Sequence, residues 1–251
     1  MKKEKNKKRK LKKSVYVLIL IIMSVALCFT LFRFISLFID QRKTSDLASD
    51  LDKQIKKNIP IEKDALASED TSQKEKVVYT RDFDELEKIN QDTVAWIEVE
   101  KTNINYPVVQ TKNNSYYLTH SFDKSKNGNG WIFLNNANNA DFSDQNTIVF
   151  AHSSLFRPLW SLYKGKYGNN IKITIYQRNQ VLTYKVFAVY LIDPNNTKII
   201  DRKLDNNVLK QAKESSKVNF NVDANENDSI LTLSTCYTDS TQRVIVQAKR
   251  V

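Results

Sequence analysis

Three residues of this chain have side chains that could together carry out nucleophilic acyl transfer: Cys236, His152 and Arg243. A cysteine attacks as its thiolate, and with an ordinary pKa of about 8.5 only a small fraction of the thiol is ionised at neutral pH. A histidine nearby can remove the proton or, as imidazolium, stabilise the thiolate. A cation or a backbone N–H must then hold the oxyanion of the tetrahedral intermediate.

Each of these residues stands at the end of a segment that the sequence predicts to be a β-strand. Cys236 follows residues 230–235, His152 follows residues 146–150, and Arg243 precedes residues 244–248. We expect the three strand ends to meet at one rim of a β-structure. Taken singly, each residue has a more ordinary interpretation, because a lone cysteine is usually a small buried side chain. A lone histidine is more often structural, and an arginine at a strand start is usually solvated or paired.

A second histidine, His120, is a rival candidate for the base. Its neighbours Tyr116, Tyr117 and Phe122 indicate a histidine packed among aromatic rings or at the edge of a cleft. No well-formed strand ends at His120, and a base must lie within hydrogen-bond reach of the proton it moves. His152 is therefore favoured.

The elements that must position these residues are short β-type segments beginning near Thr93. They are rich in β-branched and aromatic residues and are bounded by Asn, Gly, Asp and Pro. Eight strands are predicted, at residues 94–99, 104–109, 131–134, 146–150, 171–176, 181–192, 230–235 and 244–248. Short helices are predicted at 82–90, after His152, and at 204–213. This pattern predicts a mainly β fold, either a closed barrel or a sandwich.

The N-terminal region has the pattern of a membrane anchor. Residues 2–13 hold nine basic residues and one acid, and the nineteen residues of 14–32 are uncharged. Such a segment is long enough to span a bilayer, and the basic flank predicts a cytoplasmic N-terminus with the rest of the chain outside the cell. A signal peptide cleaved after Ala26 is the alternative. The basic tail holds most of the net charge of +11, so no nucleic-acid partner is predicted.

Four regions follow from these patterns: a basic cytoplasmic tail at 1–13, a transmembrane anchor at 14–39, a stalk at 40–79 and a catalytic domain at 80–251. In the stalk, Leu47, Leu51 and Ile55 recur at every fourth position and predict a short helix that ends before Pro60. Residues 61–76 have little apolar content and are predicted to be a linker.

Cysteine usage argues against a disulfide or a metal centre. Of the two cysteines, Cys28 lies in the apolar segment, so the exported part has one. A single cysteine cannot form an intramolecular disulfide or a multi-cysteine metal site. We predict no metal and no cofactor, while a calcium site in an acidic loop stays open.

Three segments resemble the sortases, the membrane-anchored cysteine transpeptidases of Gram-positive bacteria. Thr232-Leu-Ser-Thr-Cys236 matches the T-L-x-T-C motif of that family. Asn146–His152 is similar to the strand that ends in its catalytic histidine, and Arg243–Val246 to the strand that opens with its catalytic arginine. Residues 117–122, Gly130–Phe133 and the long insertion between Tyr176 and Ile230 resemble class B sortases. Two departures are Ala151, where the family usually has Gly, and a short Cys-to-Arg loop.

The resemblance implies an eight-stranded sortase-like barrel at 80–251 and a role for each motif residue. Cys236 would attack a Thr–X bond in a sorting motif of surface proteins, His152 would exchange protons with the leaving and incoming amines, and Arg243 would hold the oxyanion. Ser234 and Thr235 would bind substrate. The implied partners are sorting-signal-bearing proteins and a peptidoglycan amine acceptor, with the N-terminal helix in the membrane.

Two other functions stay open at this stage. A cysteine peptidase would release the same surface proteins by hydrolysis, although a papain-type cysteine signature is absent. A membrane-tethered binding module would carry an inert Cys236.

Overall fold

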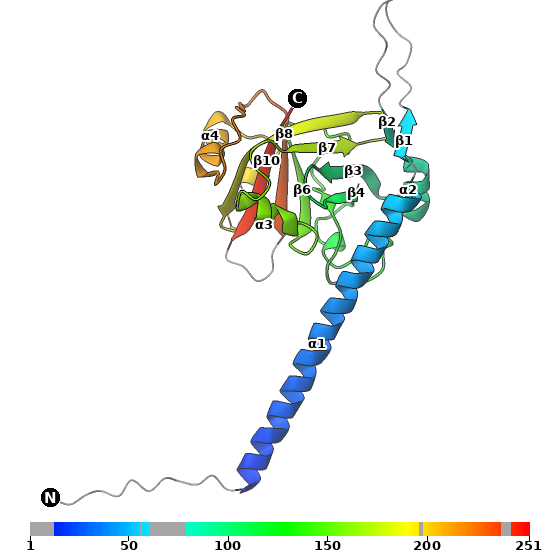
Figure 1. Ribbon diagram of the computed structural model, residues 1–251, viewed down its shortest axis with the longest axis vertical. Helices are drawn as coiled ribbons and strands as arrows, with labels where there is room; N and C mark the ends of the chain where they lie inside the picture. Colours follow the sequence, from blue (N-terminus) through cyan, green and yellow to red (C-terminus); the bar gives the residue numbers. More distant parts are fainter. Residues whose placement is uncertain (1–12, 56, 61–78, 196–197, 237–241) are drawn as a thin grey trace, which may run out of the picture.

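The computed structural model describes residues 13–55, 57–60, 79–195, 198–236 and 242–251, and shows a closed β-barrel with a long helix leading away from it (Figure 1). Eight strands form the barrel: β3 (Thr93–Val99), β4 (Asn105–Val109), β5 (Phe133–Leu134), β6 (Asn146–His152), β7 (Lys172–Tyr176), β8 (Val181–Ile192), β9 (Ile230–Cys236) and β10 (Arg243–Arg250). Their order around the wall is β10-β8-β7-β3-β4-β5-β6-β9, and β9 pairs with β10 to close it. The eight predicted strands are confirmed, and the architecture is a barrel rather than a sandwich.

Two of the strand pairs are parallel, β4 with β5 and β6 with β9, and the other neighbours are antiparallel. A parallel pair needs a long crossover connection, because the chain must return to the starting end before the second strand begins. For β6 and β9 this connection contains α3 (Arg157–Tyr163), β7, β8 and α4 (Asn206–Ser215). The crossover places the ends of β6 and β9 at the same rim.

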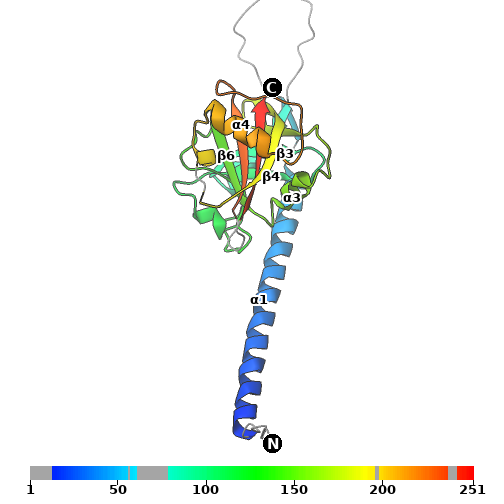
Figure 2. The same ribbon diagram turned by 90° about the vertical axis from the view of Figure 1, so that its left-hand side faces the viewer.

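Apolar side chains fill the barrel and also cover part of its outside. The larger cluster, which fills the barrel and extends to α1 and α2, includes Trp96, Ile97, Val149 and Leu233, all fully buried. A second cluster lies outside the wall, where side chains of α4 pack on β8, β9 and β10. Figure 2 shows α4 lying across this outer face. The insertion between β8 and β9 is therefore part of the packed domain.

The short helices occur where their apolar spacing predicts them, with one correction. Leu159 and Leu162 of α3 are buried, as are Leu209 and Ala212 of α4. In α2 (Phe83–Ile89), Phe83 and Leu86 are buried, but Ile89 is 42% exposed. The apolar spacing of Phe83, Leu86 and Ile89 would place all three on one buried face, but this is wrong for Ile89, because the buried face continues instead to Asn90, which is 1% exposed.

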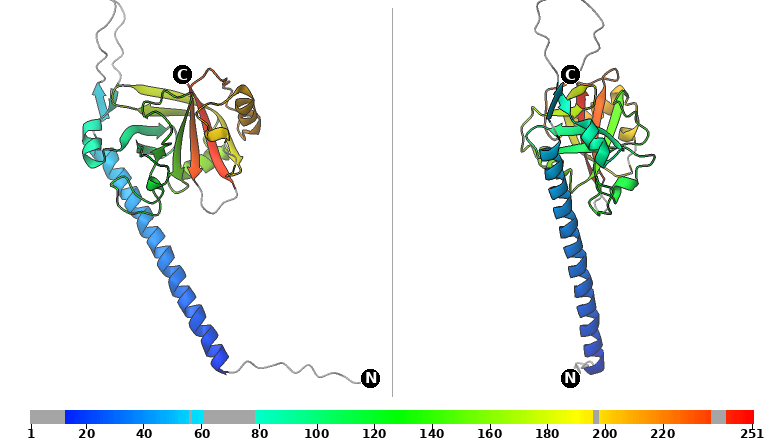
Figure 3. Two further views of the ribbon diagram at one scale, coloured as in Figure 1. Left: turned by 180° about the vertical axis from the view of Figure 1, so that it is seen from behind. Right: turned by 90° about the vertical axis from the view of Figure 1, so that its right-hand side faces the viewer.

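The N-terminal helix α1 (Lys13–Gln54) differs from the prediction because it is one continuous helix of 42 residues. The sequence predicts a membrane span followed by a separate short helix, but no Gly or Pro interrupts residues 13–54, so nothing breaks the helix between them. It is the one described helix long and apolar enough to cross a membrane. Figure 3 shows it from two sides as it leaves the barrel.

A small hairpin beside the barrel was not predicted. β1 (Lys57–Pro60) pairs antiparallel with β2 (Tyr79–Arg81), and the chain between them lies outside the described residues. That outside part includes the predicted linker at 61–76. Strands of three or four residues carry no alternating pattern from which they could be predicted.

The last turns of α1 dock on the barrel through Asp52. Its carboxylate accepts hydrogen bonds from the Arg81 guanidinium at 3.3 Å and from the Asn105 side chain at 2.8 Å. The Arg81 side chain is only 4% exposed, and its guanidinium carbon lies 3.9 Å from the centre of the Trp96 ring. Asp52 therefore neutralises a nearly buried cation.

Replacing Asp52 with alanine should lower the free energy of unfolding by about 2 kcal/mol, because the buried Arg81 loses a charged hydrogen-bond partner. Thermal or urea unfolding of the full chain in detergent measures this loss. Lys210→Ala is the control, since it removes an exposed pair with Glu214 and should cost less than about 0.5 kcal/mol. Equal effects of the two changes would contradict the expectation.

Candidate active site

The barrel wall brings the backbones of His152 and Cys236 side by side. β6 and β9 are paired in parallel and in register from Asn146 opposite Ile230 to His152 opposite Cys236. Both residues are the last of their strands. The buried Ala151, opposite Thr235, continues the strand without interruption despite the methyl group that the resemblance marks as a departure.

Arg243 opens the strand on the other side of β9. β10 runs antiparallel to β9 with Ile245 opposite Ser234, and two residues further along these strands stand Arg243 and Cys236. On its other side Arg243 is opposite Ile192 of β8. The three predicted residues therefore belong to the adjacent strands β6, β9 and β10 at one rim.

The guanidinium of Arg243 has a donor suited to a bound anion. Its Nε is buried and has no hydrogen-bond partner among the described residues. A buried N–H without a partner is costly, so a group that accepts its hydrogen bond would be stabilised there. A developing oxyanion is such a group.

The ring of His152 is oriented by a backbone carbonyl. Nε2 lies 2.8 Å from the carbonyl oxygen of Leu118, the last residue of the 3-10 helix η1 (Tyr116–Leu118). Because a carbonyl oxygen only accepts, the geometry assigns the proton to Nε2. In the neutral ring Nδ1 is then the nitrogen that can accept a proton.

Ser234 and Thr235 lie inside the wall. Both side chains are fully buried. The hydroxyl oxygen of Thr235 accepts a hydrogen bond from the backbone N–H of Val244 at 3.1 Å, which fixes the start of β10 beside Arg243. Ser234 Oγ has no partner among the described residues. Their predicted contact with substrate is not supported by this burial and stays a prediction, whereas Thr235 has a clear structural contact.

His120 is held by aromatic packing, as its neighbours indicate. Its ring stacks on the Tyr116 ring with centroids 4.1 Å apart and planes 5° apart. Its Nδ1 lies 2.9 Å from the carbonyl oxygen of Tyr116, and its backbone forms an isolated bridge with Lys126. These contacts account for His120 without a catalytic role.

A row of buried polar side chains crosses the wall beneath the α4 insertion and was not predicted. Tyr190 donates to Gln247 at 3.1 Å, Gln247 donates to Thr232 at 3.3 Å, and Thr232 donates to Asn146 at 2.7 Å. Asn146 donates in turn to the carbonyl oxygens of Ile199 and Asp201. The row joins β8, β10, β9 and β6 and ties them to the insertion. In the sequence, the only sign of this buried row is that polar residues stand among apolar ones in these strands.

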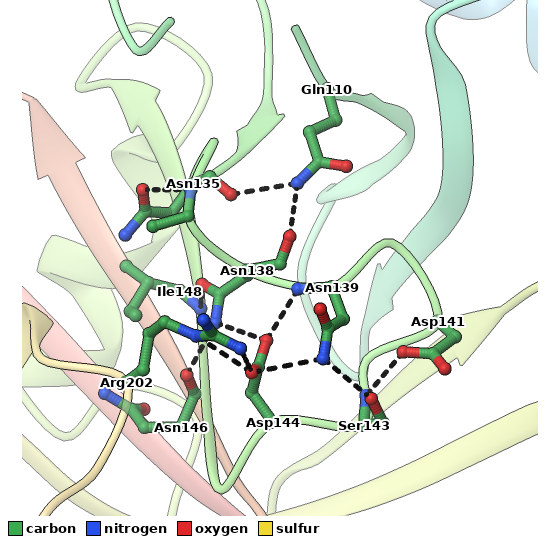
Figure 4. A network of polar contacts seen from close by, with 11 residues as sticks. Gln110, Asn135, Asn138, Asn139, Asp141, Ser143, Asp144, Asn146, Ile148 and Arg202 are labelled. Atoms are coloured by element: carbon green, nitrogen blue, oxygen red, sulfur yellow. Dashed lines mark hydrogen bonds and ion pairs between the residues drawn. The ribbon is translucent and has the colours of Figure 1, made fainter. Parts of the chain in front are cut away.

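A second polar network anchors the segment before β6 (Figure 4). Asn138 donates to the carboxylate of Asp144 at 2.8 Å and to the carbonyl oxygen of Asn146 at 2.9 Å, and accepts from the backbone N–H of Ile148. Arg202, from the insertion, forms an ion pair with Asp144. Burial pushes the pKa of Asp144 upward, but the hydrogen bonds from Arg202, Asn138 and the Asn139 backbone outweigh it and lower this pKa. The network fixes β6 at the end opposite His152.

Replacing Asp144 with asparagine should destabilise the protein at neutral pH, and the difference from the unmodified protein should shrink in acid. A carboxylate whose pKa is lowered by folding stabilises the protein above its unfolded pKa of about 4 and loses this effect as the pH falls through the folded pKa. Urea midpoints measured between about pH 7 and pH 3 test the sign. Asp223→Asn is the control, because the pKa of Asp223 is lowered by an exposed partner, Lys213. Salt screens such an exposed pair, so high salt should remove the destabilisation caused by Asp223→Asn. A difference at Asp144 that grows in acid would contradict the assignment.

Comparison with known proteins gives consistent matches. The family model for the sortase domain matches residues 97–251. Sortase B of Staphylococcus aureus is 30% identical in an alignment of 183 residues that covers 66% of this chain and 73% of that protein. Sortase B of Listeria monocytogenes is 31% identical in an alignment of 202 residues that covers 70% of this chain and 82% of that protein. The structure of Clostridium perfringens sortase B is 33% identical with a TM-score of 0.62, covering 68% of this chain and all of that one.

Proposed function

The chain belongs to the sortase family of cysteine transpeptidases, and from this premise we propose that it cleaves the sorting motif of surface proteins at a Thr–X bond and transfers them to a cell-wall amine. The main support is the parallel pairing that ends β6 and β9 at His152 and Cys236, with Arg243 opening the adjacent strand. The resemblance to class B sortases lies in other segments, at residues 117–122, at Gly130–Phe133 and in the insertion between Tyr176 and Ile230.

The proposed mechanism has two acyl-transfer steps. The thiolate of Cys236 adds to the threonine carbonyl carbon, and the oxyanion that forms accepts hydrogen bonds from the Arg243 guanidinium. The C–N bond then breaks, His152 gives a proton to the leaving amine, and a thioester remains on Cys236. An incoming amine attacks the thioester and loses its proton to His152. An amide forms and the Cys236 thiolate is released.

The acceptor is proposed to be an amine at the end of a short peptide. Sortase B of Staphylococcus aureus has been solved as a substrate complex, and a sortase B has been solved as a complex with triglycine. These structures are 30% and 29% identical to this chain, with a TM-score of 0.60 each. A glycine-type amine is therefore a suitable acceptor to test first.

Helix α1 is proposed to anchor the enzyme in the cell membrane with its basic N-terminus in the cytoplasm. Its apolar residues from Val15 to Ile39 are exposed, which suits contact with lipid. The basic residues at 2–13 favour the cytoplasmic side. The catalytic barrel would then lie outside the cell.

Cys236→Ala and His152→Ala should each abolish cleavage of a sorting-motif peptide by the full-length protein, by at least about 1,000-fold in kcat, because each removes a group that takes part in bond making or breaking. A quenched fluorescent pentapeptide library supplies the substrate. Lys210→Ala is the control for handling and folding. Cleavage that survives the loss of Cys236 would overturn the proposed function.

Triglycine should increase product formation and should appear at the new C-terminus of the cleaved peptide. Mass spectrometry of products made with and without triglycine separates transfer from hydrolysis, because water would give a free threonine carboxylate in both. A cysteine peptidase would release that carboxylate with no transfer product at any triglycine concentration.

Arg243→Ala should lower kcat by about 100-fold or more, since one charged donor to the oxyanion is lost. Arg243→Lys keeps the charge but not the planar donor Nε, and should recover only part of this loss. The kcat values of the two variants, measured on the same peptide, check the assignment. Equal activity of all three proteins would exclude Arg243 from the site.

A further inference from the structure

We propose that the part of α1 that follows its apolar residues 14–39 is a positioning element of the active site: Asp40 and Thr44 hold the turn at 127–130, which supports the Leu118 carbonyl that orients His152. The inference rests on the proposed role of His152. It gives the anchor helix a second task beside attachment.

The first step is the contact between α1 and the turn. The Asp40 carboxylate accepts a hydrogen bond from the backbone N–H of Gly128 at 3.0 Å. The side chain of Asn127 donates to the Thr44 hydroxyl at 3.0 Å and to the carbonyl oxygen of Asp40 at 3.3 Å. Thr44 is 5% exposed and Asn127 4% exposed, so the bond between their side chains is shielded from water, whereas the bond from Gly128 to Asp40 is exposed. The turn is fixed to the helix by three hydrogen bonds.

The second step joins the turn to the segment around Leu118. The backbone N–H of Asn127 donates to the carbonyl oxygen of Thr119 at 2.9 Å, and that of Trp131 donates to Tyr117 at 2.8 Å. These bonds lie on either side of Leu118. A movement of the turn must therefore move the Leu118 peptide with it.

Gly130 shows how closely the two segments fit. Its φ is +58°, which favours glycine, and its N–H donates to the Asn127 carbonyl at 3.0 Å. A Cβ added at this position would lie 2.2 Å from the Tyr117 carbonyl oxygen and 3.0 Å from that of Leu118. The turn thus lies directly against the backbone that carries the His152 acceptor.

The third step is the hydrogen bond from His152 to Leu118, at 2.8 Å. Because this bond assigns the proton to Nε2, it decides which nitrogen exchanges a proton with the amine. A displacement of the carbonyl tilts the ring or weakens the bond, and catalytic groups tolerate little displacement. The effect should fall on the rate of the chemical step more than on peptide binding.

The other docking point of α1 provides a matched comparison. Asp52 lies twelve residues after Asp40, about 18 Å along the helix, and its contacts are with Arg81 at the end of β2 and Asn105 at the start of β4. Loss of Asp52 loosens the helix on the barrel without touching the turn at 127–130. It separates general destabilisation from the loss of His152 positioning.

The test measures kcat, KM and melting temperature of full-length protein in detergent micelles with a sorting-motif peptide. Asp40→Ala combined with Thr44→Val should lower kcat by about 10-fold and change KM by less than about 2-fold. Gly130→Ala should give at least the same loss of kcat. Asp52→Ala should lower the melting temperature while keeping kcat within about 2-fold of the unmodified protein.

Conservative changes at the same positions should restore the rate. Asp40→Asn keeps an acceptor for the Gly128 N–H, and Thr44→Ser keeps the hydroxyl, so both should have nearly full kcat. The inference is overturned if the double variant keeps its kcat, or if Asp52→Ala loses as much kcat for the same fall in melting temperature. Failure of the proposed function is recognised separately, because His152→Ala would then remain active.

Discussion

Two strands that lie far apart in the sequence, β6 and β9, must pair in parallel and in one register for His152 and Cys236 to end at the same rim. The crossover between them supplies α3, two more strands and α4, so the site depends on the closure of the whole barrel. A closed barrel has no free sheet edge along which a strand can slide or pair with another molecule. The rim therefore carries its functional groups on a fixed frame.

Buried polar groups specify the register that apolar packing alone leaves less defined. A slip of one residue between β6 and β9 would separate Thr232 from Asn146 and turn each side chain to the opposite face. Gln247 and Tyr190 continue the row into β10 and β8. A slip would therefore break buried hydrogen bonds that join four strands. Unpaired polar groups in such a wall are expensive, so one arrangement is strongly favoured. The Asp144 network adds a second fixed point at the start of β6.

The sequence predicted the eight strands because β-branched segments between Asn- and Gly-containing turns have a strong local pattern, which left a barrel and a sandwich open until the resemblance to sortases implied the barrel. It also predicted the order of Cys236, His152 and Arg243 at strand ends. It did not predict that α1 is continuous, since the charges that begin at Asp40 suggest a boundary although helical geometry tolerates them. The carbonyl of Leu118, which orients His152, belongs to a loop whose side chains show nothing of the backbone contact. Such contacts between distant segments depend on the tertiary fold and have no local pattern.

Helix α1 runs without a break to its contacts on the barrel, so no flexible joint separates the helix from the docked domain. A flexible tether of twenty residues would let a domain move over roughly 25 Å. The docked turns of α1 instead hold the barrel at one distance along the helix and in one orientation about its axis. If α1 lies in a bilayer as proposed, the rim would meet its partners through lateral diffusion of the entire protein. The peptide substrate and the amine acceptor would then have to reach the rim at one fixed distance from the membrane. That distance would select among substrates in addition to the shape of the site.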